Sequence, residues 1–121
     1  MKKIILAPAI ILLIAAGTIL LFVRSNNPAN SSNNSLDDFA RCLSEKGAVM
    51  YGTNVCSHCQ EQKKIFGDSF QLVRYVDCFQ NVAECQQKSI ENVPTWIFGD
   101  GEKIIGVQSI EELSQRTNCP L

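Results

Sequence analysis

Apolar and polar positions divide the chain into three unequal parts. Residues 4–23 are predominantly apolar and carry no charge. Residues 25–35 are polar and low in complexity, and from residue 36 onward apolar side chains recur with the spacings of helices and strands. We therefore expect an N-terminal membrane anchor or signal peptide at residues 1–24, a flexible linker at residues 25–35 and one small domain at residues 36–121.

The apolar segment is long enough to cross a bilayer, because a helix needs about 20 residues for a hydrocarbon core of roughly 30 Å. Lys2 and Lys3 precede it, which favours a cytoplasmic N-terminus and an exported domain. The small residues at positions 15–17 are compatible with a cleaved signal peptide instead. The apolar run continues beyond them, so we favour an uncleaved single-pass anchor. Both interpretations place the domain in the periplasm, another extracytoplasmic space or an equivalent lumen.

Within the domain, the spacing of apolar residues predicts alternating helices and strands that end in a hairpin. Ser35 is expected to cap the first helix, and Ser109 with Glu112 forms a capping box for the last one. This order predicts an α/β fold, in which helices cover both faces of a mixed central sheet. The expected elements are a helix ending at Gly47, a strand at 48–51, a helix at 60–66, a strand at 70–76, a helix at 82–89, strands at 93–98 and 102–107, and a helix to about residue 117.

Charge excludes one class of partner. The chain carries a formal net charge of −1, and all 12 acidic residues lie beyond the apolar segment. The exported part is therefore mildly acidic and has no basic stripe, so we do not expect it to bind nucleic acid.

Cysteine usage agrees with an exported domain. An even number of cysteines in a small domain outside the cytoplasm suggests disulfides, although six cysteines allow fifteen pairings and the sequence alone does not select one. The six residues are Cys42, Cys56, Cys59, Cys78, Cys85 and Cys119.

The stretch "VCSHCQ" contains a Cys-x-x-Cys motif at Cys56 and Cys59. A structural zinc site needs four ligands, often as two close pairs, and the other cysteines lack that spacing, so we expect no metal. A purely structural bridge is also unsatisfactory, because so short a loop removes little entropy from the unfolded chain.

A redox role accounts for more of the motif. Cys56 follows an expected strand and opens an expected helix, where the unpaired amides and the helix dipole favour a thiolate. His58 lies between the cysteines and would stabilise the thiolate further, unless it is simply an exposed polar residue. Cys59, one turn along the helix, would be the resolving thiol.

A proline marks the other half of the expected site. Pro94 follows Val93 at the start of an expected strand, and such a proline is most simply a strand-edge residue. Together with the motif at Cys56 and Cys59, however, the order of elements over residues 36–119 resembles the thioredoxin-like superfamily. That resemblance implies that Cys56 is the nucleophile, that Cys59 resolves, and that Pro94 is a cis-proline whose neighbour Val93 pairs with the substrate backbone.

Two longer stretches carry a narrower resemblance. "FARCLSEKGAVMYGTNVCSHCQEQKKIFGDSF" and "VPTWIFGDGEKIIGVQSIEEL" are similar to the thioredoxin-like domain joined to bacterial and plant homologues of vitamin K epoxide reductase. The four-helix quinone-reducing membrane domain of those proteins has no counterpart in this sequence. The resemblance therefore implies a separate membrane partner that resembles vitamin K epoxide reductase.

The sequence also departs from the thioredoxin pattern. Met50 stands where thioredoxin has a buried acid, and Val55 stands where it has a tryptophan. Proton exchange with Cys59 would then fall to Glu61 or to water. Lys63 and its neighbour Lys64 are interpreted as a solvated helix face.

The remaining four cysteines are candidates for structural disulfides. Cys78 and Cys85 flank a loop and a helix start, close enough to be bridged, and we expect them to pair in an oxidising compartment. Cys42 and Cys119 would then be left to pair, or to shuttle electrons to or from the active pair.

Our leading hypothesis is a membrane-anchored thiol-disulfide oxidoreductase that donates its Cys56–Cys59 disulfide to protein thiols and needs no cofactor beyond that disulfide. One alternative is a reductase or isomerase kept reduced by a membrane electron carrier. Another is a thioredoxin-fold binding module without turnover.

Overall fold

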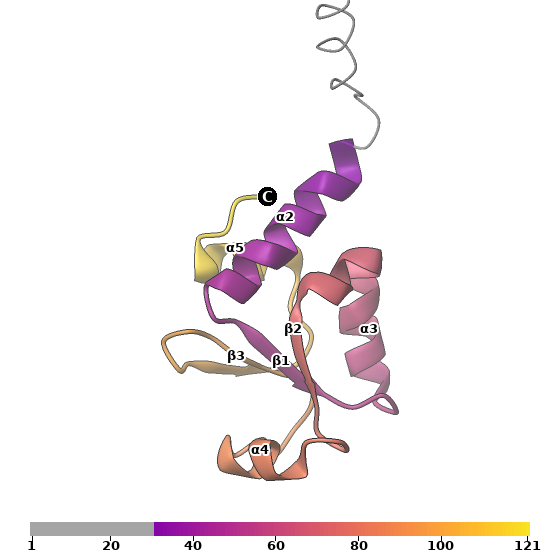
Figure 1. The fold of residues 1–121 in the computed structure, drawn as a ribbon, viewed down its shortest axis with the longest axis vertical. Coiled ribbons are helices and arrows are strands. Elements are labelled where there is room, and N and C mark those ends of the chain that lie inside the picture. The colour runs from indigo at the N-terminus through magenta and orange to yellow at the C-terminus, as the bar shows by residue number, and fades with distance from the viewer. Residues whose placement is uncertain (1–30) are drawn as a thin grey trace, which may run out of the picture. The chain divides into compact units, whose positions relative to one another are not determined.

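The computed structural model describes residues 31–121, so the expected membrane segment lies outside the described residues. Between residues 31 and 121, no helix is both long enough and apolar enough to span a bilayer. The elements, shown in Figure 1, are α2 (Ser31–Glu45), β1 (Val49–Gly52), α3 (Ser57–Phe66), the 3-10 helix η2 (Gly67–Leu72), β2 (Arg74–Asp77), α4 (Val82–Gln87), β3 (Thr95–Ile97), β4 (Lys103–Ile105) and α5 (Ile110–Thr117).

The strands form a mixed four-stranded sheet with the order β2-β1-β3-β4. β1 runs parallel to β2 and antiparallel to β3, and β3 and β4 form the expected antiparallel hairpin. Because β1 and β2 are parallel, their carboxyl ends meet at the same edge of the sheet, and α3 begins there. This mixed α/β arrangement fits the thioredoxin-like fold that the sequence resembles.

Helices α2, α3 and α5 pack on one face of the sheet. Phe66 of α3 lies at the centre of this layer, with its ring centroid 6.1 to 6.2 Å from the ring centroids of Phe39, Phe70 and Trp96. Met50 and Trp96, which are partners across β1 and β3, are fully buried beneath the helices. One contiguous apolar core therefore fixes α3, and the cysteines at its start, against the sheet.

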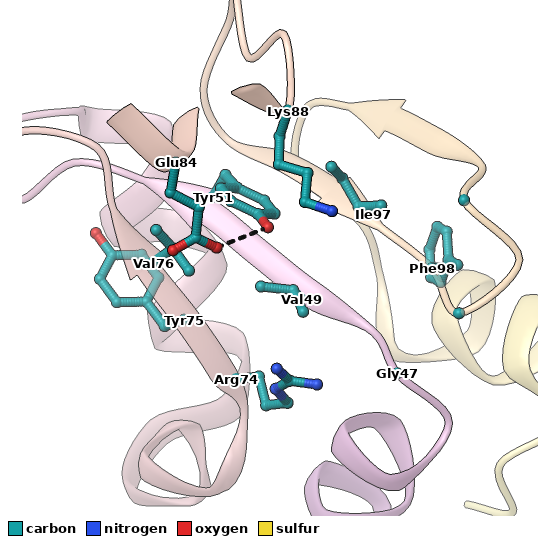
Figure 2. A pocket seen from close by; sticks show the side chains of 12 residues that line it. Gly47, Val49, Tyr51, Arg74, Tyr75, Val76, Glu84, Lys88, Ile97 and Phe98 are labelled. Carbon is teal, nitrogen blue, oxygen red and sulfur yellow. Dashed lines mark hydrogen bonds between the residues drawn. The ribbon is translucent and has the colours of Figure 1, made fainter. Parts of the chain in front are cut away.

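The opposite face of the sheet is covered less completely. Tyr51 and its neighbours on β1, β2 and β3 line a groove of about 730 Å³, and Glu84 and Lys88 reach over it from α4 (Figure 2). The hydroxyl of Tyr51 donates a hydrogen bond to Glu84 Oε1 at 3.2 Å. Helices therefore lie on both faces of the sheet, as predicted, but the coverage is unequal. Within residues 31–121, only the short helix α4 lies over this second face.

Several element boundaries differ from the prediction. α2 begins at Ser31, so Ser35 lies within the helix and residues 31–35 of the expected linker are helical. Serines recur at positions 31, 32 and 35, so several could cap a helix, and the apolar spacing does not choose among them. Ser109 and Glu112 do form the expected capping box, and α5 begins directly after Ser109.

The expected strand at 70–76 is shorter in the structure. The 3-10 helix η2 occupies Gly67–Leu72, and β2 begins only at Arg74. The ring of Phe70 packs against the rings of Phe66 and Tyr75, which accounts for its apolar character without a strand. An apolar residue in a tight turn and one in a short strand give the same local pattern.

The structure contains the expected Cys78–Cys85 disulfide and, of the two alternatives left open for Cys42 and Cys119, the disulfide between them. Cys42 on α2 is bonded to Cys119 beyond α5, across 77 positions of the chain. Cys78 is bonded to Cys85 across 7 positions and closes the loop between β2 and α4. Cys56 and Cys59 remain free thiols.

The two structural disulfides should differ in their contribution to stability. Loop-closure entropy predicts that replacing Cys42 and Cys119 with alanine lowers the free energy of unfolding by about 4 kcal/mol, whereas replacing Cys78 and Cys85 lowers it by about 2 kcal/mol. Denaturant unfolding of the two double variants under identical conditions measures this difference. An equal loss in both would contradict the entropic origin.

Candidate thiol-disulfide site

Cys56 lies at the N-cap of α3, just beyond the carboxyl end of β1. Its Sγ accepts a hydrogen bond from the backbone amide of Cys59 at 3.1 Å. The sulfur therefore occupies the place that a serine or aspartate oxygen takes in other N-caps. Cys56 is half-buried, so this sulfur remains accessible to another protein.

Cys59 is the buried member of the pair, with none of its surface exposed. Burial, followed by its hydrogen bond with Cys56, raises the pKa of the Cys59 thiol to about 11. The positive charge of Lys63 acts in the opposite direction, but it does not offset the burial. At neutral pH Cys59 is therefore a protonated thiol next to an accessible one.

The segment at Pro94 faces the first of these sulfurs. The Val93–Pro94 peptide bond is cis, as the resemblance implied, and Pro94 is buried. Cys56 Sγ lies 3.7 Å from the carbonyl oxygen of Val93, to which its thiol donates. The fold thus brings together Cys56, Cys59, Val93 and Pro94, which the sequence analysis had grouped from separate parts of the chain.

His58 occupies the exposed position that the sequence analysis gave as the alternative to a contact with the sulfurs. Its side chain is 72% exposed, and its Nδ1 atom lies 3.4 Å from Glu61 Oε2 one turn along α3. Within the described residues, His58 forms no hydrogen bond to either sulfur. Because residues three apart share one face of a helix, this histidine meets Glu61 on the solvent side.

Glu61 is equally poorly placed for proton exchange with Cys59, because its side chain is 62% exposed and faces His58. Lys63, in contrast, is not simply solvated. Its Nζ atom lies 4.0 Å from the ring centroid of Tyr75 and 5.5 Å from that of Phe70. The prediction of a solvated face is therefore wrong for Lys63, whose stem follows the aromatic surface beside the site.

Gln62 is a residue that sequence analysis missed. Although it is polar, it is fully buried. Its Oε1 accepts hydrogen bonds from Trp96 Nε1 at 3.2 Å and from the backbone amide of Gln108 at 2.7 Å, and its Nε2 donates to the Gln108 carbonyl at 3.0 Å. Its burial could have been predicted from its position three residues after Cys59, which places both side chains on the same face of the helix.

Tyr75 and Gly52 were also missed. A methyl group on Gly52 would lie 3.1 Å from Cys59 Sγ and 3.4 Å from the Tyr75 hydroxyl oxygen. Glycine thus lets both side chains approach the same point at the end of β1. No local sequence pattern predicts this arrangement, because Tyr75 reaches it from the neighbouring strand β2.

Metal ligands do not gather around these sulfurs. Over residues 31–121, the structure contains no group of three or more histidine, cysteine, aspartate or glutamate side chains placed to hold a metal ion. The arrangement is instead that of two thiols of unequal exposure, which can form and break a disulfide with each other.

Comparison with known proteins connects this geometry to redox chemistry. No protein-family model matches the chain. Over 91 residues it is 36% identical to the thiol-disulfide oxidoreductase LTO1 of Arabidopsis thaliana, a match that covers 68% of this chain and 24% of LTO1. The chain thus spans about a quarter of the length of this plant relative. The similarity and the mixed α/β sheet together support a thioredoxin-like redox domain.

Replacement of Gln62 tests how firmly α3 is held. The Gln62→Leu variant leaves the indole N–H of Trp96 and the backbone amide and carbonyl of Gln108 without their partner. It should lower the free energy of unfolding by about 2 to 4 kcal/mol, measured by denaturant unfolding. Gln60→Leu on the same helix is the control, because the Gln60 side chain bonds Asn54 at the surface and should change stability by less than about 0.5 kcal/mol.

Alkylation of the reduced protein tests the burial of Cys59. Because a raised pKa disfavours the thiolate, the reaction of Cys59 with iodoacetamide should be slow at pH 8 and increase roughly tenfold per pH unit until it levels off near pH 11. Mass spectrometry of the labelled peptides gives the rates.

The same chain in urea provides the control, since Cys59 there should level off near its ordinary pKa of 9.0. The raised pKa also makes the stability of the fold depend on pH. Because the pKa of Cys59 is higher in the folded than in the unfolded chain, the contribution of Cys59 to stability is fully present below pH 9 and is lost as the pH rises towards 11. Equal rates for folded and unfolded Cys59 at pH 8 would refute the raised pKa.

Proposed function

We propose that this chain is a membrane-anchored thiol-disulfide oxidoreductase that donates its Cys56–Cys59 disulfide to substrate proteins on the exported side of a membrane. The observation that carries the proposal is the meeting of an accessible sulfur, a buried sulfur and the carbonyl of Val93 at one edge of the sheet. The 36% identity to a plant thiol-disulfide oxidoreductase supports the same chemistry.

Exchange begins when a substrate thiolate attacks Cys56 Sγ, the exposed end of the disulfide. The bond between the two sulfurs breaks, and Cys59 leaves with the electron pair and then takes up a proton. A second substrate thiolate attacks the substrate sulfur of the mixed disulfide and expels Cys56. The substrate loses two electrons and two protons, and the pair gains both.

Val93 would guide the substrate during this reaction. The Val93 carbonyl points at Cys56 Sγ, so a backbone segment laid beside it would bring its own cysteine to that sulfur. Extended peptides commonly bind by main-chain hydrogen bonds of this kind. Protein thiols are therefore the proposed substrates.

The cellular setting rests on the sequence. The uncharged stretch at residues 4–23, with Lys2 and Lys3 before it, supports a single membrane anchor and an exported domain. The Cys42–Cys119 and Cys78–Cys85 bonds are typical of an oxidising compartment. We further propose that a membrane partner resembling vitamin K epoxide reductase re-oxidises the reduced pair.

Oxidation of a reduced substrate protein by the full-length chain in detergent tests the activity. The oxidised protein should form one substrate disulfide per molecule, and both Cys56→Ser and Cys59→Ser, which lack the donated disulfide, should be inactive. With the oxidised substrate instead, the Cys56 thiolate of Cys59→Ser should attack the substrate disulfide, release one substrate thiol and remain trapped as a mixed disulfide. Replacement of both Cys78 and Cys85 with alanine is the matched control and should retain activity. A wild-type protein that bound the substrate without oxidising it, equally well in Cys59→Ser, would instead favour a binding module.

Trapping of free thiols in cells, with an acid quench and an alkylating mass tag, tests the direction. A donor should be found with Cys56 and Cys59 mainly oxidised. A mainly reduced pair would contradict donation and favour a reductase or isomerase.

A further inference from the structure

Tyr75 on β2 carries a buried hydroxyl group that no other group satisfies. Among residues 35–121, its oxygen is the one buried side-chain nitrogen or oxygen atom without a hydrogen-bond partner. A buried polar group without a partner costs free energy, so its position in a native structure calls for an explanation. The neighbouring reactive sulfur provides one.

We propose that Tyr75 is a further catalytic residue of the exchange reaction proposed above: its hydroxyl turns to Cys59 Sγ and donates a hydrogen bond when that sulfur becomes a thiolate. The inference rests on the proposed function for its place in a reaction cycle. The proximity of the two groups comes from the structure alone, which contains no hydrogen bond between them.

The space between the two groups is open because of Gly52. The point where a side chain of residue 52 would begin lies 3.1 Å from Cys59 Sγ, 3.1 Å from Tyr75 Cε2 and 3.4 Å from the Tyr75 hydroxyl oxygen. No larger residue at position 52 would leave this space free. The Cys59 sulfur and the Tyr75 hydroxyl oxygen therefore border the same small space, and a movement of either side chain into it would bring them closer.

Two side chains contact the ring of Tyr75. Lys63 Nζ lies 4.0 Å from its centroid, and the ring of Phe70 packs edge-on at 5.6 Å between centroids. The charge of Lys63 also favours the Cys59 thiolate. Tyr75 on β2 and Lys63 on α3 thus bring a hydrogen-bond donor and a cation to the surroundings of Cys59.

No carboxylate occupies this position. Met50 stands where a buried acid would lie, and its Cα partner on β2 is Tyr75. The proposed donor to Cys59 therefore comes from the neighbouring strand. It is a neutral donor, which stabilises a thiolate, whereas an ionised acid would repel it.

The hydroxyl remains a donor at physiological pH. Burial, with smaller contributions from the charges of Asp77, Cys59 and Cys56, raises the pKa of Tyr75 to about 12. When the disulfide opens, Cys59 leaves with the electron pair and accepts the O–H of Tyr75 as a hydrogen bond. The protons that finally neutralise Cys56 and Cys59 balance those lost by the two substrate thiols.

Tyr75→Phe tests the inference, with Tyr51→Phe as the matched control on the adjacent strand. The oxidised full-length protein in detergent is reduced by dithiothreitol, and the fluorescence of Trp96 reports the rate. Loss of a hydrogen bond to a charged sulfur should slow Tyr75→Phe about tenfold at pH 7. It should also move the alkylation profile of Cys59 to higher pH by about one unit. Tyr51→Phe should leave both unchanged.

Thermal unfolding separates this role from a structural one. Because Tyr75→Phe removes an unsatisfied group, its Tm should equal or exceed that of the wild type, although the reaction is slower. Gly52→Ala, which places a methyl group between the hydroxyl and the sulfur, should slow the reaction as well.

Wild-type rates and an unchanged Cys59 profile in folded Tyr75→Phe would overturn the inference while leaving the proposed function intact. Conversely, the wild type could fail to oxidise any substrate protein while Tyr75→Phe still slowed the reaction with dithiothreitol. That result would reject the proposed function and retain the role of Tyr75.

Discussion

The buried amide of Gln62 holds the functional helix in place. Its three hydrogen bonds join α3 to Trp96 on β3 and to Gln108 in the segment that leads from β4 to α5. Apolar packing around Phe66 sets the distance of α3 from the sheet. The three hydrogen bonds add directional contacts that help to fix the axial position of α3. The spacing between Cys56 at the helix start and the Val93 carbonyl depends on that position.

The unequal chemistry of the two sulfurs follows from this placement. A helix that begins at the carboxyl end of β1 exposes its N-cap residue and turns the residue three positions later towards the sheet. Cys56 therefore remains accessible, and Cys59 is buried and protonated. A substrate can reach only one end of the disulfide, and the sulfur that leaves is the one enclosed by protein. The surroundings of Cys59, more than those of Cys56, then govern how readily the bond opens.

Sequence patterns predicted the features that depend on local spacing. They gave the order of helices and strands, the start of α3 at the cysteines and the capping box at Ser109. They failed where several residues satisfy the same local rule, as at Ser35, or where one apolar residue fits both a turn and a strand, as at Phe70. They also left the role of His58 open, because spacing between two cysteines does not tell which way the side chain turns on the helix. Tyr75 could not be found at all, since its meeting with Cys59 depends on the pairing of β1 with β2.

The distribution of satisfied and unsatisfied buried groups distinguishes support from function. Gln62 and Tyr75 both place polar atoms beside the core, yet Gln62 bonds through both its oxygen and its nitrogen, whereas the Tyr75 hydroxyl makes no bond. A hydroxyl that served only to stabilise the fold would be more favourable as phenylalanine, because its burial costs free energy. The Tyr75 hydroxyl lies near Cys59, where the proposed reaction forms a negative charge in the interior. The fold tolerates the hydroxyl without a partner there, and a hydrogen bond to the Cys59 thiolate would offset the cost of its burial.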